Sequence, residues 1–287
     1  MKTRIITGIC AIALFVPICW FSDTVVFPLA FAIISAVGVF EMAKCLGVHN
    51  DIFLTVPMYL VAFCVPFLRF FFMRQSHYLA VALILVFAIL VYALLYVMLR
   101  KNKDDLSRVL TMYAMFLYIV GCFASVVCLR YYDFYGTKNI IDGKYLYLLV
   151  FIGAWVCDTF AYFTGKFFGK HKLIPEISPK KTVEGSIGGI VFTMGAFALY
   201  GLILQKGFDY VLSGNLVMNY MIFILLGLGA AIISQIGDLI ASAVKRQYNI
   251  KDYGFIFPGH GGILDRFDSV MLVAPAIYMF FIAATIL

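Results

Sequence analysis

The chain has 287 residues, of which 64% are hydrophobic and only 13% are charged, and its formal net charge is +7 at pH 7. Its mean hydropathy is +1.00, whereas soluble domains contain about 45–50% apolar residues. This composition excludes a soluble globular enzyme and predicts an integral membrane protein.

Apolar runs of roughly 20 residues, each long enough to cross the hydrocarbon layer as a helix, take up most of the chain. We therefore predict an all-α, polytopic membrane protein with about nine transmembrane helices. The N-terminus resembles a signal peptide, but no small-residue cleavage site precedes Ser22, so we expect the first span to be retained. The predicted helices are 5–21, 24–40, 52–72, 78–99, 109–129, 145–165, 186–204, 217–243 and 268–286.

Basic residues are distributed unevenly over the segments that join these helices. With a cytoplasmic N-terminus, sixteen of the 22 Lys and Arg residues fall on the cytoplasmic side and six fall outside. Because basic residues accumulate in cytoplasmic loops, we predict a cytoplasmic N-terminus, an external C-terminus and two cytoplasmic loops, 166–185 and 244–267. The same charge could instead serve only to attach the protein to anionic lipid headgroups.

Polar groups are concentrated in residues 151–287, which we interpret as the catalytic transmembrane region, with residues 1–150 as scaffold helices. The first group lies near the end of the sixth predicted span, where Trp155, Asp158, Tyr162 and Gly165 fall on one helical stripe. A carboxylate at the centre of a span costs about 2.5–3.5 kcal/mol on insertion scales, so Asp158 should face a cavity or a partner. The alternative is a packing pair with a neighbouring helix.

The second polar group, Ser178–Gly185, precedes the seventh predicted span. Ser178 or Thr182 could cap the incoming helix, whose first N–H groups, together with Lys180 and Lys181, could bind an anion such as a triphosphate. Two adjacent lysines before a span are also common as positive-inside anchors, which is the alternative role for this pair.

The third polar group begins inside the eighth predicted span, where Ser234, Asp238, Ser242 and Lys245 recur at helical spacing. Such a stripe is typical of a helix face that lines water or substrate. Asp238 and Asp265 supply carboxylates from two different elements, as a divalent cation shared with substrate phosphates requires.

Between these two aspartates lies a glycine-rich turn, Pro-Gly-His-Gly-Gly at 258–262, which leads into the last predicted helix. A turn of this kind before a helix N-terminus is a ready phosphate cradle, although glycines in a loop are often simply turn residues. His260 could likewise contact substrate or be a solvated loop residue. Asp265 and Asp268 are three residues apart, so they can share one helical face.

These residues together resemble the phosphatidate cytidylyltransferase family, also called CDP-diacylglycerol synthases. The family signature, Ser-x-x-Lys-Arg, Lys-Asp, Pro-Gly-His-Gly-Gly and Asp-Arg-x-Asp, is present from Ser242 to Asp268 without a departure. The motifs at 155–165, 178–185 and 237–239 are also similar to those of the family, so the resemblance covers about 155–269. Residues 1–150 are similar only in being hydrophobic helices.

The resemblance implies a homodimeric enzyme of the cell (inner) membrane that makes CDP-diacylglycerol and pyrophosphate from CTP and phosphatidate by metal-assisted in-line attack on the α-phosphorus. It implies Mg²⁺ as a cofactor and leaves room for a second, monovalent cation such as K⁺. The expected partners are CTP, phosphatidate and membrane lipid, with no nucleic acid. Because CTP is cytosolic and the motifs fall on the predicted cytoplasmic face, we expect the active site there.

The resemblance also implies roles for single residues. Asp238 and Asp265 would hold the metal, with Asp268 and Asp158 supporting it or binding a second cation. Lys181 and Lys245 are the foremost candidates for phosphate contacts and complete the expected catalytic set with Asp238 and Asp265. The other expected substrate-binding residues are Ser178, Lys180, Thr182, Ser242, Arg246, Lys251, Gly259, His260, Gly261, Gly262 and Arg266.

Two other functions remain open at this point. A CTP-dependent lipid kinase would transfer the γ-phosphoryl group to a lipid alcohol and would need a general base. An ion-coupled transporter would use Asp158 and Asp238 as a translocation site, although no internal repeat is visible and the charges cluster toward one face.

Overall fold

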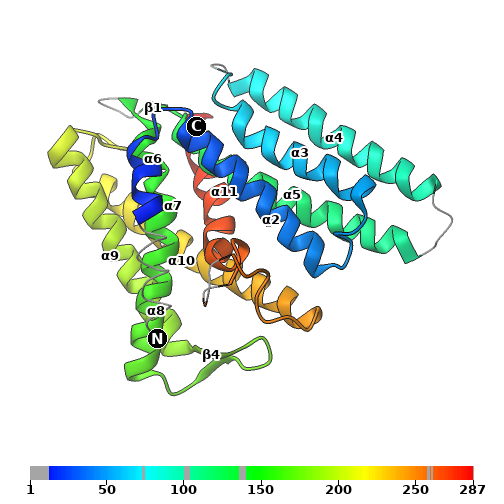
Figure 1. Cartoon of the computed structure of the whole chain (residues 1–287). Helices are drawn as coiled ribbons and strands as arrows, with labels where there is room; N and C mark the ends of the chain where they lie inside the picture. Colours follow the sequence, from blue (N-terminus) through cyan, green and yellow to red (C-terminus); the bar gives the residue numbers. More distant parts are fainter. Residues whose placement is uncertain are drawn as a thin grey trace. The chain divides into compact units, whose positions relative to one another are not determined.

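The structure is a computed structural model that describes residues 13–72, 75–99, 104–135, 140–256, 259 and 261–286. Helices account for most of these residues, and the strands among them form two small antiparallel sheets, β1–β2 and β3–β4. The chain divides into two compact units, whose elements are labelled in Figure 1. The first unit comprises Met1–Cys128 and Gln247–Arg266, and the second comprises Leu129–Arg246 and Phe267–Leu287.

The first unit contains α2 (Val26–Cys45), α3 (Ile52–Leu68), α4 (Gln75–Leu99) and most of α5 (Asp104–Arg130). In Figure 1, α2 runs beside α3 and α3 beside α4, and these pairs are in contact. Gly38 of α2 lets α5 approach closely, because a Cβ at this position would lie 3.2 Å from the side chain of Ile119. These contacts hold the C-terminal half of α2 in place.

The second unit is built mainly from the helices on either side of a short hairpin. Its helices are α6 (Gly143–Leu146), α7 (Leu148–Phe151), the π-helix η1 (Ile152–Val156), α8 (Cys157–Phe168), α9 (Val183–Phe208), α10 (Leu216–Gln247) and α11 (Leu264–Ile286) from Phe267 onward. The strands are β1 (Phe134–Tyr135), β2 (Ile140–Ile141), β3 (Lys172–Ile174) and β4 (Ser178–Thr182).

Glycines allow the helices of the second unit to pack closely. α8 packs against α9, as Figure 1 shows, and a Cβ at Gly188 would lie 2.3 Å from the Thr164 hydroxyl oxygen. A Cβ at Gly237 of α10 would lie 2.8 Å from the backbone carbonyl oxygen of Asp268 on α11. α10 and α11 therefore approach each other at the level of Asp238 and Asp268, two of the predicted site residues.

The prediction of an all-α, polytopic membrane protein is confirmed. Seven helical segments among the described residues are long and apolar enough to cross a membrane, and α3 is a shorter apolar helix of 17 residues. Residues 5–12 of the first predicted span lie outside the described residues. The count of nine helices and the orientation of the termini stay predictions.

Several predicted boundaries are wrong. α10 continues to Gln247, so Lys245 and Arg246 belong to a helix and not to the predicted loop 244–267. The predicted loop 166–185 contains the end of α8, the β3–β4 hairpin and the start of α9. The predicted helices ended too early because charged and hydroxyl side chains lower the local hydropathy in both regions. A helix can nevertheless continue beyond the apolar layer.

The sixth predicted span also differs locally from a regular α-helix. The segment Gly143–Phe168 is continuous and apolar, but η1 inserts a wider π-turn immediately before α8. The wider turn breaks the 3.6-residue period on which the predicted stripe of Trp155 with Asp158 depended. Single π-turns occur frequently at functional sites, and this one directly precedes the helix that carries Asp158.

Candidate active site

The second unit brings a lysine of the hairpin against an aspartate of α10. Lys181 is on β4, and its Nζ lies 2.6 Å from Oδ2 of Asp238. Both side chains are about a quarter exposed, at 24% and 25%. On the other side of the carboxylate, the Ser242 hydroxyl donates a hydrogen bond to Asp238 Oδ1 at 3.3 Å. Lys181, Asp238 and Ser242 therefore meet at one point, although Lys181 and Asp238 are 57 positions apart in the sequence.

A second contact in the same unit joins α8 to α11. The Ser269 hydroxyl donates to Asp158 Oδ2 at 2.8 Å, and the Ser269 N–H donates to Asp268 Oδ1 at 2.9 Å. Asp268 also interacts electrostatically with Asp158, Asp238 and Lys245. We call these residues the aspartate cluster: Asp158, Lys181, Asp238, Ser242, Lys245, Asp268 and Ser269.

The composition of the aspartate cluster suits a cation. Three carboxylates close together in an apolar protein repel one another, and Mg²⁺ takes oxygen ligands of this kind. Among the described residues, however, no group of three or more His, Cys, Asp or Glu side chains is spaced to hold a metal ion. The donor chemistry fits Mg²⁺, but the ligand positions do not form a ready coordination shell, and the metal stays a prediction.

The hairpin that carries Lys181 is anchored by local capping. Of the two predicted caps for α9, Thr182 is the one used, because its Oγ1 accepts the N–H of Gly185 at 3.1 Å. Glu184, to which the sequence assigned no role, accepts the N–H groups of Lys170 at 3.1 Å and His171 at 3.2 Å. Thr182 and Glu184 together connect both ends of the hairpin to the first turn of α9.

The remaining predicted residues of this region lie at the edge of the hairpin and of α10. Lys180 is exposed and Ser178 is half-buried on β4. Arg246 is exposed near the end of α10, where its Nε donates to the carbonyl oxygen of Ile177 at 3.5 Å. An exposed guanidinium and an exposed ammonium beside the aspartate cluster are suitable donors for phosphate oxygens.

The first unit contains the connection between α10 and α11, residues 248–263, and the first residues of α11. Asp265 is buried, with 6% of its surface exposed. Its Oδ2 accepts the N–H of Tyr253 at 2.7 Å and the N–H of Gly262 at 2.9 Å. Asp265 thus closes the connection into a loop, and its predicted role as a metal ligand would have to be compatible with these two bonds.

The local backbone structure explains the glycines of the predicted phosphate cradle without a bound phosphate. Gly259 and Gly261 have φ of 79° and 82°, a left-handed backbone that side chains with a Cβ rarely adopt. The N–H of Gly262 is already bonded to Asp265. Lys251 is exposed in the connection and Arg266 is exposed in the first turn of α11, and His260 lies outside the described residues.

Glu41 of α2 is a residue of this loop that the sequence analysis missed. Its two carboxylate oxygens accept the N–H groups of Ile263 at 3.0 Å and Leu264 at 2.9 Å. The sequence could have indicated Glu41, because it directly follows the predicted span 24–40 and the helix α2 continues to Cys45. A correct boundary would have placed a carboxylate inside a span, as for Asp158.

The aspartate cluster and the Asp265 loop belong to different units. The predicted pairing of Asp238 with Asp265 on one metal therefore stays a prediction. The structure brings Asp238 together with Lys181 and Ser242, and Asp265 together with Tyr253 and Gly262.

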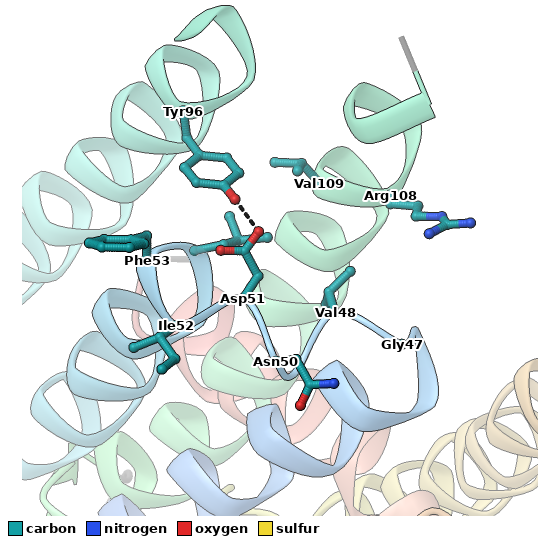
Figure 2. Close-up of a pocket in the computed structure, with 10 residues that line it drawn as sticks. Gly47, Val48, Asn50, Asp51, Ile52, Phe53, Tyr96, Arg108 and Val109 are labelled. Atoms are coloured by element: carbon teal, nitrogen blue, oxygen red, sulfur yellow. Dashed lines mark hydrogen bonds between the residues drawn. The ribbon is translucent and has the colours of Figure 1, made fainter. Parts of the chain in front are cut away.

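A pocket of about 480 Å³ lies elsewhere in the first unit, at the start of α3 (Figure 2). In Figure 2 the Tyr96 hydroxyl of α4 points at the carboxylate of Asp51 and donates a hydrogen bond to it, drawn as a dashed line. None of the predicted site residues is among the described residues that line this pocket, so its size does not make it the candidate site. The lining residues are Gly47, Val48, Asn50, Asp51, Ile52, Phe53, Leu54, Tyr96, Arg108 and Val109.

Carboxylates that suit a cation, beside lysines that suit phosphate oxygens, are typical of membrane enzymes that act on phosphate-bearing substrates. Comparison with known proteins identifies the family. The model of the cytidylyltransferase family matches residues 2–284. The chain therefore belongs to the cytidylyltransferase family and is a nucleotidyltransferase.

Curated relatives match over nearly the whole chain. A phosphatidate cytidylyltransferase of Bacillus subtilis (strain 168) is 37% identical over 284 residues, which is 97% of this chain and 96% of the relative. Phosphatidate cytidylyltransferases of Staphylococcus epidermidis (strain ATCC 12228 / FDA PCI 1200) and Staphylococcus aureus (strain COL) are 33% and 34% identical over 277 residues, 96% of each chain. The similarity thus extends beyond 155–269 and includes α2, which carries Glu41.

Proposed function

We propose that this protein is a phosphatidate cytidylyltransferase, which converts CTP and phosphatidate into CDP-diacylglycerol and pyrophosphate. The observation that carries the proposal is the contact of Lys181 with Asp238 and Ser242, next to Asp158 and Asp268. This contact supports the proposal because a lysine ammonium beside carboxylates is a suitable donor for phosphate oxygens. The chain also matches phosphatidate cytidylyltransferases over nearly its whole length.

In the proposed reaction, a phosphate oxygen of phosphatidate attacks the α-phosphorus of CTP. A bond forms between that oxygen and the α-phosphorus, the bond from the α-phosphorus to the bridging oxygen of the β-phosphate breaks, and pyrophosphate leaves with the electron pair. Because the nucleophile is already an anion, no side chain has to remove a proton from it. Catalysis then depends on positioning and on screening negative charge.

The side chains of the aspartate cluster have distinct tasks in this reaction. Lys181 and Lys245 bind phosphate oxygens, and Ser242 orients the carboxylate of Asp238 by its hydrogen bond. Ser269 orients Asp158 in the same way. Exposed Lys180 and Arg246 guide the triphosphate toward the cluster.

Mg²⁺, when bound, would supply charge neutralisation for the triphosphate. The proposal keeps the roles that the family resemblance implied, with Asp238 and Asp265 as metal ligands and with Asp268 and Asp158 as residues that support the metal or bind a second cation. A cation that binds Asp238 Oδ2 would compete with the Lys181 ammonium, which lies 2.6 Å from that oxygen. A monovalent cation such as K⁺ is a further part of the proposal.

The topology proposed for this function has nine transmembrane helices, a cytoplasmic N-terminus and an external C-terminus, in the cell (inner) membrane. The active site then faces the cytoplasm, where CTP is found, while the acyl chains of phosphatidate stay in the bilayer. The enzyme would act as a homodimer. Cysteine labelling from either side of the membrane tests the orientation.

Product analysis tests the reaction itself. Purified protein in detergent is incubated with CTP, Mg²⁺ and either phosphatidate or diacylglycerol, and the soluble products are separated. The proposal predicts pyrophosphate and CDP-diacylglycerol with phosphatidate only. Release of CDP with diacylglycerol as the acceptor would identify a lipid kinase instead, and no turnover with either acceptor would contradict an enzyme of this class.

A further inference from the structure

Glu41 is among the most buried charged residues of the first unit. Only 2% of its surface is exposed, and it lies near the end of α2, a helix long and apolar enough to cross a membrane. Burying an ionised carboxylate without partners is costly, so its partners determine whether it is tolerated. Its hydrogen-bond partners among the described residues are backbone N–H groups at the start of α11, those of Ile263 and Leu264. Glu41 also interacts electrostatically with Lys44 and Asp265.

These contacts make Glu41 a cap supplied by another helix. The first N–H groups of a helix have no partner within the helix, and the helix dipole favours a negative charge at that end. Each carboxylate oxygen of Glu41 accepts one such N–H, at 3.0 Å and 2.9 Å. The N-terminus of α11, which the sequence predicted as a place for phosphate, is thus occupied by a carboxyl group of the protein itself.

The loop leaves room for this carboxylate by means of two glycines. A Cβ on Gly254 would lie 2.3 Å from Oε1 of Glu41, and a Cβ on Gly262 would lie 2.2 Å from the same atom. Neither glycine has a positive φ, so the space taken by Glu41 explains them and backbone strain does not. Gly254 and Gly262 therefore leave the space that the Glu41 side chain fills.

Glu41 and Asp265 together engage three consecutive N–H groups. Gly262 N–H is bonded to Asp265, and the next two, of Ile263 and Leu264, are bonded to Glu41. The residue after Leu264 is Asp265 itself. Rotation of the loop at Ile263 would therefore turn the Asp265 carboxylate directly.

We propose that Glu41 is a positioning residue for the nucleotidyl transfer, which fixes the backbone of residues 262–264 and thereby the orientation of Asp265 and Arg266. This inference rests on the proposed function. Glu41 acts through the backbone of the loop and does not touch substrate. Its removal should lower the turnover of folded enzyme, whereas a residue that only stabilises the fold would alter the amount of folded enzyme and leave its turnover intact.

Glu41→Gln is the first variant to test, because it keeps one acceptor oxygen and replaces the other by an amide that faces an N–H donor. Its matched control is Asp51→Asn, which removes a carboxylate of the same unit that accepts a hydrogen bond from Tyr96. Folded protein is quantified by gel filtration, and kcat and KM for CTP are measured with saturating phosphatidate and Mg²⁺.

The positioning role predicts that Glu41→Gln lowers kcat per folded enzyme about 100-fold, the scale of a misplacement of about 1 Å at a reacting group. Asp51→Asn should retain wild-type kcat. A Glu41→Gln enzyme with wild-type kcat and KM would overturn the inference. If the wild type itself makes no CDP-diacylglycerol, the proposed function fails, which is a different result.

Gly254→Ala tests the same contact from the loop side without removing a charge, because its Cβ would collide with Glu41 Oε1. It should also lower kcat, and the double variant with Glu41→Gln should lose less than the product of the two single effects. Should Glu41→Gln fail to fold, Gly254→Ala and Glu41→Asp decide the matter. Wild-type kcat in whichever of these folds would contradict the positioning role.

Discussion

Replacement of Lys181 by methionine removes the ammonium group and keeps most of the aliphatic side chain. Two unit charges 2.6 Å apart interact by about 6 kcal/mol at an effective dielectric constant of about 20. Because both side chains are about a quarter exposed, desolvation and solvent screening offset most of this energy. We expect Lys181→Met to lower the free energy of unfolding by about 1–2 kcal/mol.

The expected effect on activity is larger. In the proposed reaction Lys181 donates to a phosphate oxygen, and a hydrogen bond to a charged group contributes about 1.5–3 kcal/mol. Its loss should lower kcat/KM for CTP about 10- to 100-fold. The assay measures pyrophosphate release at subsaturating CTP. The matched control is Lys206→Met, which removes an exposed lysine from the last turn of α9 and should leave kcat/KM unchanged.

A double-mutant cycle separates the ion pair from the reaction. Lys181→Met combined with Asp238→Asn should show a coupling of about 1–2 kcal/mol in stability, because each single variant leaves the other charge without its partner. Activity should stay low in the double variant, since both groups also act on substrate. The reasoning is refuted if Lys181→Met has wild-type kcat/KM for CTP, or if the double variant regains activity.

Three further predictions follow from the same contacts. Thr182→Val removes the hydrogen bond that caps α9 at Gly185 and should lower the free energy of unfolding by about 1 kcal/mol, whereas Thr182→Ser should keep the bond and the stability. Equal melting temperatures for the two variants would show that the cap is unimportant. Ser269→Ala should destabilise the protein by about 1 kcal/mol, because the hydrogen bond that orients Asp158 is lost. It should also raise the Mg²⁺ concentration needed for half-maximal activity. An unchanged Mg²⁺ titration would argue against a metal role for Asp158. Chelation with EDTA should abolish pyrophosphate release and added Mg²⁺ should restore it, and activity that persists in EDTA would exclude the proposed metal.

The helical architecture was predictable because long apolar runs have few other structures available in a membrane. Errors arose where polar residues continue a helix. Lys245 and Arg246 extend α10 beyond its apolar part, and Glu41 lies within α2 although the predicted span ended at residue 40. Hydropathy marks the apolar part of a helix, whereas the end of the helix depends on capping and on tertiary partners.

The candidate site was predictable in composition and not in its contacts. The free-energy cost of a carboxylate inside a membrane span indicated Asp158. Helical spacing indicated Asp238 with Ser242, and the structure joins these two residues by a hydrogen bond. The contact of Lys181 with Asp238 depends on the β3–β4 hairpin, whose Lys, Pro and His residues carry little strand signal. Ser269 directly follows the Asp-Arg-x-Asp motif, and nothing in the sequence indicated its hydrogen bond to Asp158 on α8, which depends on the tertiary structure.

The most direct test of the account follows the phosphorus atoms of CTP in the presence of phosphatidate and Mg²⁺. CTP labelled at the α or the γ phosphate is supplied to the wild type, to Asp238→Asn, and to Asp209→Asn as a control. Asp209 is exposed at the end of α9 in the left-handed conformation that asparagine tolerates. We predict α label in the lipid and γ label in pyrophosphate for the wild type and Asp209→Asn, with both lost in folded Asp238→Asn. Transfer of γ label to lipid, or full activity in Asp238→Asn, would contradict the account.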